Sequence, residues 1–158
     1  MPLSLLGGLT IATPAGEVVS LPTRKTALVL ATLALLDERG ATREALTEWI
    51  WPDRSDGQGK SSLRQALTAI RKVLPTVLGD ATLESDHDSL RLIGPAAPID
   101  LRRFEAVAGS AAPGDRIHAA ALYAGDLLAG VQLTEALESL VTAHRERLHR
   151  RPWRWSRP

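Results

Sequence analysis

Residues 59–74 form an amphipathic run that contains no acidic side chain. At about 100° per residue, its large aliphatic side chains fall on one narrow stripe: Leu63, Leu67, Ile70 and Leu74. The opposite face carries Ser61, Gln65, Thr68 and Lys72, with Arg64 beside them and Lys60 and Arg71 also basic. The pattern predicts a helix over 59–74 that is buried along one stripe, with the helical pattern ending at Pro75.

A helix of this kind suits insertion into the major groove of DNA. Arg and Gln side chains can form bidentate pairs with guanine and adenine edges, while Ser, Thr and Lys side chains reach phosphates. An ordinary surface helix with a solvated basic face has the same pattern, so the flanking segments decide between the two interpretations.

Two further helices are predicted before this run. Residues 23–39 are apolar over most of a helical circumference and end at Gly40, which indicates a central, buried helix. A shorter helix over 43–51 has Thr42 as its N-cap, and Pro52 ends it. Polar turn residues at 53–57 connect it to the basic helix. Trp51 is expected in the core, where the three helices meet.

Short strands are predicted on both sides of the helices. Residues 82–84 and 90–93 alternate around a polar loop at 85–89, as in a β-hairpin. Ahead of the first helix, three apolar or alternating segments predict a small antiparallel sheet: 3–6, 9–11 and 17–21. The order helix, turn, helix and hairpin is that of a winged helix, and the fold class expected is α+β.

The segments also resemble a known family in their order and spacing. The segments concerned are Leu5-Leu6-Gly7-Gly8-Leu9, Leu21-Pro22-Thr23-Arg24-Lys25, Thr42-Arg43-Glu44-Ala45-Leu46, Ile50-Trp51-Pro52 and Ser62-Leu63-Arg64-Gln65-Ala66-Leu67. They look like the OmpR/PhoB-type winged helix of antibiotic-regulatory (SARP-type) transcriptional activators. Ile99-Asp100-Leu101, Phe104-Glu105 and Leu122 to Gly130 resemble the start of the helical, TPR-like bacterial transcriptional activation domain (BTAD) of that family.

The resemblance implies a sequence-specific DNA-binding regulator, an activator that binds promoter-proximal repeats of double-stranded DNA and contacts RNA polymerase. Base contacts are assigned to the exposed face of the basic helix: Arg64, Gln65 and Thr68. Backbone contacts are assigned to Lys60, Ser61, Lys72, Arg24, Lys25 and Arg91. Two alternatives remain open: a protein-interaction module whose winged helix no longer binds DNA, and a truncated regulator that binds without activating.

The predicted organisation has three parts. A winged helix spans 1–93, a partial activation or dimerisation module spans 99–150, and a basic Trp/Arg tail at 151–158 is expected to be disordered. Relatives are expected to continue through further helical hairpins, so the apolar stripe of the helix capped by Thr134 lacks its usual cover. That stripe consists of Leu137, Leu140, Val141, His144 and Leu148. We therefore expect either a homodimer through this face or a mobile segment beyond Leu133.

Composition sets limits on the function. The net charge of the chain is +1, and residues 1–93 hold ten Lys or Arg against eleven Asp or Glu, so DNA binding must depend on local placement of charge. The absence of cysteine excludes disulfides and fits a reducing cytoplasm. The N-terminus does not have the pattern of a signal peptide, and the longest apolar stretch, 27–36, is too short to span a bilayer. We expect a cytoplasmic, nucleoid-associated protein with no membrane partner.

Catalytic interpretations are disfavoured. Asp86-His87-Asp88 lies in a short loop without a second ligand cluster, which argues against a metal site. Residues 57–61 resemble the end of a phosphate-binding loop, but the earlier glycine that the motif requires is Arg54 here. The sequence therefore predicts neither an enzyme nor a cofactor.

Overall fold

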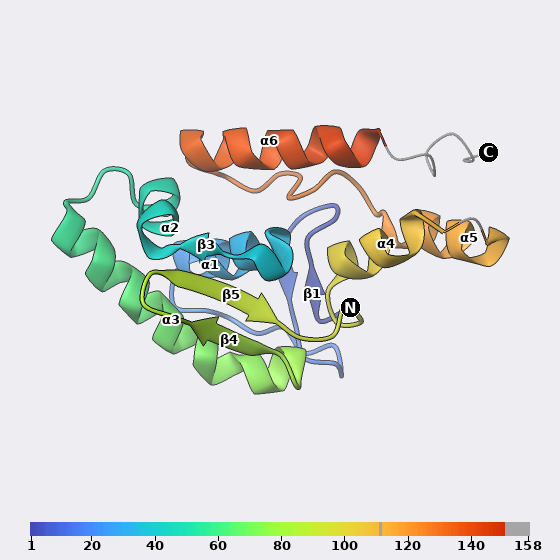
Figure 1. Cartoon of the computed structure of the whole chain (residues 1–158). Coiled ribbons are helices and arrows are strands. Elements are labelled where there is room, and N and C mark those ends of the chain that lie inside the picture. Colours follow the sequence, from blue (N-terminus) through green and yellow to red (C-terminus); the bar gives the residue numbers. More distant parts are fainter. Residues whose placement is uncertain (111, 151–158) are drawn as a thin grey trace.

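The computed structural model describes residues 1–110 and 112–150, the side chain of Asp37 excepted. The tail predicted at 151–158 lies outside the described residues. Figure 1 shows helices and small sheets in the first two-thirds of the chain, then a projecting helical hairpin, and the last helix across the top. The mixed helix and sheet composition agrees with the expected α+β class.

The chain begins with a short antiparallel pair. Strand β1 (Leu3–Ser4) pairs with β2 (Thr10–Ile11), with Leu3 opposite Ile11. The strand expected over 17–21 does not form, and a single bridge joins Val18 to Ala12 there. Val18 is 78% exposed, and Val19 and Leu21 are only half-buried against the core, so little burial is available to hold a longer strand in register.

Helix α1 (Arg24–Leu35) is the central helix of the fold. Thr23 caps it by accepting the N–H of Thr26 at 3.1 Å, and every residue from 28 to 35 is buried. The helix was expected to continue to Arg39, but the α-helix ends at Leu35 and a 3₁₀ turn, η1 (Asp37–Arg39), follows. The carbonyls of Leu33 and Ala34 accept hydrogen bonds of 3.2 Å from the buried guanidinium of Arg102. These carbonyls belong to the last turn of α1, so Arg102 supplies hydrogen-bond partners to the end of the helix.

Helices α2 and α3 follow the expected order. Strand β3 (Ala41–Thr42) leads into α2 (Arg43–Ile50), and Thr42 caps α2 by accepting the N–H of Ala45 at 3.0 Å. Helix α3 spans Asp56–Leu78, so it begins earlier than expected and continues through Pro75. The expectation that Pro75 ends the helix is therefore wrong. Pro75 is exposed, and the buried stripe continues beyond it with Val77 and Leu78, whose burial offsets the lost backbone hydrogen bond.

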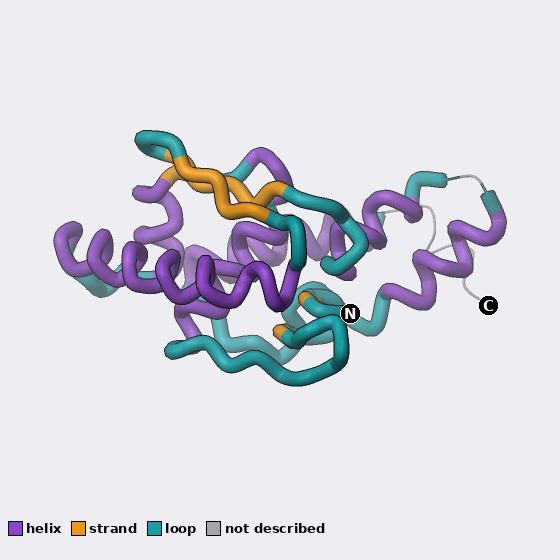
Figure 2. The backbone as a smooth tube through the Cα atoms, turned by 90° about the horizontal axis from the view of Figure 1, so that it is seen from below, coloured by secondary structure: helices purple, strands orange, loops and turns teal. Residues whose placement is uncertain are grey.

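The predicted hairpin is present. Strands β4 (Thr82–Ser85) and β5 (Ser89–Ile93) are antiparallel, and β3 pairs with the other edge of β5, which gives the order β3-β5-β4. Leu83, Leu90 and Leu92 are buried on the inner face of this sheet. The hairpin lies beside α3, and its loop at 86–88 approaches the N-terminal half of that helix (Figure 2).

The rest of the chain forms three helices. Helices α4 (Asp100–Ala108) and α5 (Pro113–Leu122) make a hairpin that projects from the body, while α6 (Glu135–His149) lies across α2 (Figure 1). The Thr134 hydroxyl oxygen accepts the N–H of Leu137 at 3.2 Å, which confirms Thr134 as the N-cap of α6. The same hydroxyl donates to the carbonyl of Trp49 near the end of α2.

The apolar stripe of α6 is covered. Leu137, Val141 and Leu148 are buried, and Leu140 and His144 are half-buried. The expectation of an uncovered stripe is therefore wrong, because α6 packs on α2 and joins the core of the first two-thirds of the chain. The reason for expecting a dimer or a mobile segment at this face is removed.

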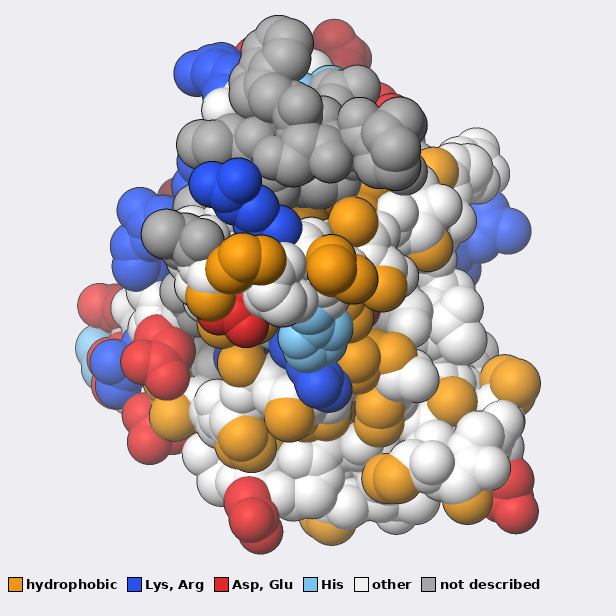
Figure 3. Space-filling view, turned by 90° about the vertical axis from the view of Figure 1, so that its right-hand side faces the viewer, with side chains coloured by type: hydrophobic (Ala, Val, Ile, Leu, Met, Phe, Trp, Pro, Cys, Tyr) orange, Lys and Arg blue, Asp and Glu red, His pale blue; other side chains and the backbone are white. Residues whose placement is uncertain are grey.

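One hydrophobic core extends through both predicted modules. It includes Leu3 and Leu30 as well as Phe104 and Leu127, and Trp51, at 5% exposed, lies in it as expected. Side chains of different types are intermixed on the face at the α5 end (Figure 3), where Ile117 is exposed. Within the described residues, no helix is both long and apolar enough to cross a bilayer.

Candidate nucleic-acid interface

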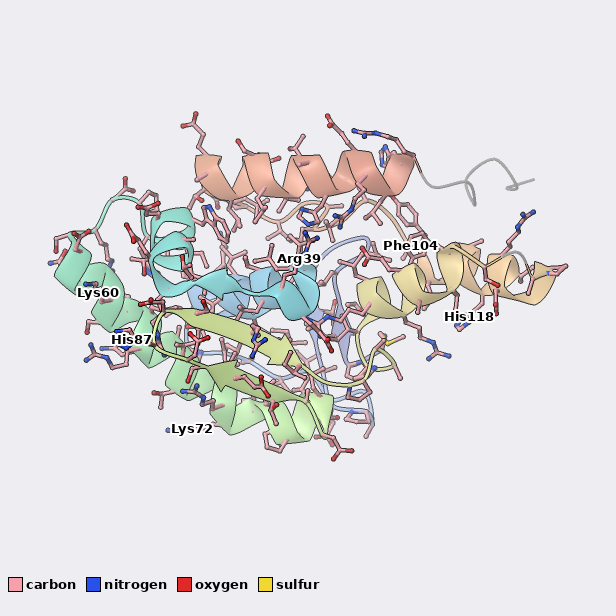
Figure 4. The ribbon with its side chains drawn as sticks, in the orientation of Figure 1. Arg39, Lys60, Lys72, His87, Phe104 and His118 are labelled. Carbon is pink, nitrogen blue, oxygen red and sulfur yellow. The ribbon has the colours of Figure 1, made fainter. Side chains whose placement is uncertain are left out.

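The outer face of α3 presents most of the predicted contact residues to solvent. Lys60, Ser61, Arg64, Gln65, Thr68 and Lys72 are all exposed. Lys60 and Lys72 extend from the outer side of the helix, with His87 near Lys60 (Figure 4). The Thr68 hydroxyl donates to the Arg64 carbonyl at 3.0 Å, so its methyl group and an oxygen lone pair remain available to a ligand.

A cleft of about 670 Å³ lies between α2, the N-terminal half of α3 and the hairpin loop, and we name it the α2–α3 cleft. Its charged and titratable lining consists of Arg43, Glu44, Glu48, Asp56, Lys60, Arg64, His87 and Asp88. Thr42, Thr47 and Leu63 complete the lining. The cleft therefore joins the predicted contacts Lys60 and Arg64 to residues of α2 and of the hairpin.

Two contacts fix the geometry of these elements. Gly59 of α3 is buried against Thr47 of α2, and a Cβ at Gly59 would lie 2.3 Å from the Thr47 Cγ2 atom, so only glycine permits this approach. Farther along α3, the Arg71 guanidinium donates to the Ser85 hydroxyl at 3.3 Å, which connects α3 to β4.

The hairpin loop is ordered by its own side chains. The Asp86 carboxylate accepts the N–H groups of Ser89 at 2.9 Å and Asp88 at 3.1 Å. These backbone hydrogen bonds, that of Ser89 first, lower the pKa of Asp86 below its usual value, because they stabilise the ionised carboxylate. The Asp88 carbonyl in turn accepts the N–H of Arg43 at 2.8 Å, which places the loop beside the start of α2.

Three of the predicted backbone contacts lie on elements other than α3. Arg91 on β5 is exposed and forms an ion pair of 3.1 Å with Glu84 on the neighbouring strand. Arg24 and Lys25 belong to the first turn of α1, where the Arg24 guanidinium donates to the Gln132 side chain at 2.8 Å. The structure thus brings Lys60 and Arg64 together but places Arg24 in a separate groove beside β2.

Sequence reasoning missed three residues of this surface: Arg43, Arg71 and His87. Arg71 was recognised as basic, but its contact with the hairpin depends on how β4 lies beside α3. Arg43 and His87 are adjacent because β3 pairs with β5, with Thr42 opposite Ser89. The position of Arg43 directly after an N-cap was readable from the sequence, whereas the pairing of β3 with β5 was not.

The comparisons with known proteins support the fold. No family model matches the sequence, and no curated protein is similar to it in sequence. Among solved structures, the chain is similar to Mycobacterium tuberculosis EmbR in complex with a low-affinity phosphopeptide, with a TM-score of 0.68 and 23% identity. The similarity covers 93% of this chain and 41% of the EmbR chain. The likeness shows that nearly the whole chain has the fold of a part of EmbR.

Proposed function

We propose that this protein is a DNA-binding transcriptional regulator of SARP type, built on a winged helix. In this proposal α3 is the recognition helix and the β4–β5 hairpin is the wing. The observation that carries the proposal is the exposed outer face of α3, which has no acidic residue after Asp56 in the first turn. The fold shared with EmbR, a regulator, supports the same class of function.

The roles of the side chains follow from their positions on α3. Arg64, Gln65 and Thr68 lie on its exposed face and read base edges in the major groove. Lys60, Ser61 and Lys72 flank them and contact phosphates. Arg91, on the wing, contacts the backbone after exchanging Glu84 for a phosphate. Arg24 and Lys25 contact the backbone from the first turn of α1. Contact with RNA polymerase belongs to the same proposal.

Binding to random duplex DNA, measured at several salt concentrations, tests the proposal, and selection from random sequences then identifies the preferred site. Gln65→Ala is expected to cost about 1–3 kcal/mol on that site and to relax preference at one base pair. Lys72→Ala is expected to weaken binding to all duplexes equally and to lower the salt slope by about one. Arg116→Ala removes the same charge from an exposed position on α5, away from the recognition helix, and is the matched control.

A protein-interaction module that does not bind DNA is the second candidate. Its support is the charge balance, since residues 1–93 carry one more acidic than basic side chain. A wild-type protein that binds no duplex at low salt, with α3 variants that remain folded, would favour this candidate. Unchanged affinity and unchanged sequence preference in Gln65→Ala would show that the orientation proposed for α3 is wrong.

A further inference from the structure

The two helical walls of the α2–α3 cleft differ in the sign of their net charge. On α3, Lys60 and Arg64 are one helical turn apart and both line the cleft. On α2, Glu44 and Glu48 are also one turn apart and line the same cleft. Any anion that approaches Lys60 and Arg64 from within the cleft therefore also approaches two carboxylates.

These carboxylates are not neutralised by neighbours. Glu44 and Glu48 are exposed, and among the residues that the structure describes neither forms an ion pair with a basic side chain. Lys60 and Arg64 also form no ion pair within the described residues, so the two rows face each other without closing the cleft. Like charges four residues apart on a helix cost a few tenths of a kcal/mol, so the Glu44–Glu48 arrangement does not favour α2 itself.

The loop adds to the acidic side of the cleft. Asp88 lines it, and Asp56 lies at the start of α3 on the same cleft. Arg43 is the one basic residue of α2 among the lining residues, and its position at the first residue of the helix places it beside the loop. The charged lining thus consists of four carboxylates and three permanently charged cations, with His87 as the remaining titratable group.

We propose that Glu44 and Glu48 are affinity-limiting residues that repel DNA phosphates at the cleft and so hold down sequence-independent binding. This inference rests on the proposed function, since it assumes that α3 binds duplex DNA. The two carboxylates reduce the attraction that Lys60 and Arg64 exert on the phosphate backbone. Stable binding then depends more strongly on the base contacts of Gln65 and Thr68, which lie on the exposed face of α3 outside the cleft.

The expected size of the effect follows from Coulomb's law. In water, unit charges separated by roughly 6–10 Å interact strongly enough to change an equilibrium constant by about two- to threefold, and salt reduces this beyond a Debye length of about 10 Å. Two carboxylates facing several phosphates should therefore lower the affinity for random DNA by about fivefold at low salt. Phosphate contacts carry no sequence information, so the effect is independent of sequence.

The test compares wild-type protein with the double variant Glu44→Gln/Glu48→Gln in binding to a random duplex, between about 50 and 200 mM salt. We expect the double variant to bind about fivefold more tightly at the lowest salt, with a smaller difference at the highest salt. The sequence selected from random DNA should remain the same. Glu17→Gln removes one negative charge from the loop between β2 and α1, outside the cleft, and should change the affinity little.

Two further variants keep the test independent of folding. Glu44 lies in the first turn of α2, where a carboxylate stabilises the helix, so Glu44→Gln is expected to destabilise α2 slightly. The single variant Glu48→Gln keeps Glu44 and avoids this loss of stability. Glu48→Lys should raise the affinity for random DNA beyond that of Glu48→Gln, and circular dichroism establishes that each variant is folded.

The outcomes separate this inference from the proposed function. If the wild-type protein binds random duplex DNA and the folded Glu→Gln variants bind it with the same affinity, the affinity-limiting role is overturned and the proposed function remains. A change confined to particular sequences also overturns it, because Glu44 or Glu48 would then read a base such as cytosine. A wild-type protein and variants that bind no duplex overturn both. Weak wild-type binding with clear binding by the double variant supports both.

Discussion

Gly7 and Gly125 lie in contact although they are far apart in the sequence, and a Cβ built on Gly125 would lie 3.0 Å from the Gly7 Cα atom. Gly7 has φ of 89°, and its N–H donates to the Asp126 carbonyl at 2.8 Å. Beside this contact, the Leu128 N–H donates to the Leu5 carbonyl at 2.7 Å. The N-terminal segment is thus joined to the chain between α5 and α6 by backbone contacts that a side chain at either glycine would disturb.

Gly7→Ala is expected to destabilise the fold by about 2–4 kcal/mol. A left-handed φ costs a non-glycine residue about 1–2 kcal/mol, and the new Cβ would also lie 3.3 Å from the Ala124 carbonyl carbon. Gly16→Ala is the matched control, because Gly16 has φ of 93° and nothing lies within 4 Å of its Cβ position. Chemical denaturation should show a larger loss for Gly7→Ala, and equal losses would mean that the contact with Gly125 contributes nothing.

Gly59→Ala tests the close approach of α2 and α3. The added methyl group would lie 2.3 Å from Thr47 Cγ2, and overpacking of this kind typically costs about 1–3 kcal/mol. Thr47→Ser removes that methyl group and keeps the hydroxyl that donates to the Arg43 carbonyl, so it should restore stability to the Gly59→Ala variant. Gly57→Ala, with nothing within 4 Å, should stabilise the helix by up to about 1 kcal/mol. Thermal melts of Gly59→Ala, Thr47→Ser, the double variant and Gly57→Ala measure these differences. A double variant no more stable than Gly59→Ala would contradict the argument.

Local patterns predicted most of the elements. The caps Thr42 and Thr134 and the stripe from Leu63 to Leu74 act within a few residues, so the sequence itself identifies the helices they define. Pro75 misled the prediction because burial of Val77 and Leu78 beyond it is a tertiary effect.

The tertiary contacts could not be predicted in the same way. Arg102 donates to the Ala34 carbonyl at the end of α1 from a position 68 residues later in the chain, and no local pattern marks that partner. The α2–α3 cleft is a similar case. Its basic residues Lys60 and Arg64 were predicted from α3 alone, whereas their proximity to Glu44 and Glu48 depends on how α2 packs against α3.

His144 gives the fold a pH dependence. Burial, chiefly, and the nearby cations Arg147 and Arg39 lower its pKa below 6.5, against an opposing effect of the Leu140 carbonyl, which lies 3.0 Å from Nδ1. The unfolded chain therefore takes up a proton on His144 at higher pH than the folded chain does. The contribution of neutral His144 to the free energy of unfolding is present above about pH 6.5 and is lost as the pH falls.

The free energy of unfolding should therefore fall more in wild-type protein than in His144→Gln between about pH 7.5 and 5.5. Asp100 acts in the opposite direction, since burial raises its pKa and its protonation on acidification favours the fold. Both proteins contain Asp100, so the difference between them isolates His144. Urea unfolding at each pH measures the free energy of unfolding of both proteins. If it changed with pH in the same way in both, His144 would not be the source of the pH dependence.

The chain from 1 to 94 is expected not to fold as an isolated unit, although the sequence predicts a winged helix there. Three of its structural requirements come from later residues. Asp100 is buried and accepts the N–H groups of Leu5 at 2.7 Å and Leu6 at 3.0 Å. Arg102 binds the last carbonyls of α1, and α6 covers α2 through Leu137 and Val141.

Removal of these groups leaves buried amides and carbonyls without partners and exposes the apolar side of α2. An unsatisfied buried polar group costs about 1–3 kcal/mol, so losses at several sites approach the whole stability of a small domain. A fragment of residues 1–94 should therefore show no cooperative thermal transition, whereas residues 1–150 should melt as one unit. In the full chain, Asp100→Asn should cost about 1–3 kcal/mol, because an amide nitrogen would face at least one of the three N–H donors, those of Leu5, Leu6 and Leu101. A fragment that melts cooperatively near the temperature of the full chain would show that the winged helix is independent of α4 and α6.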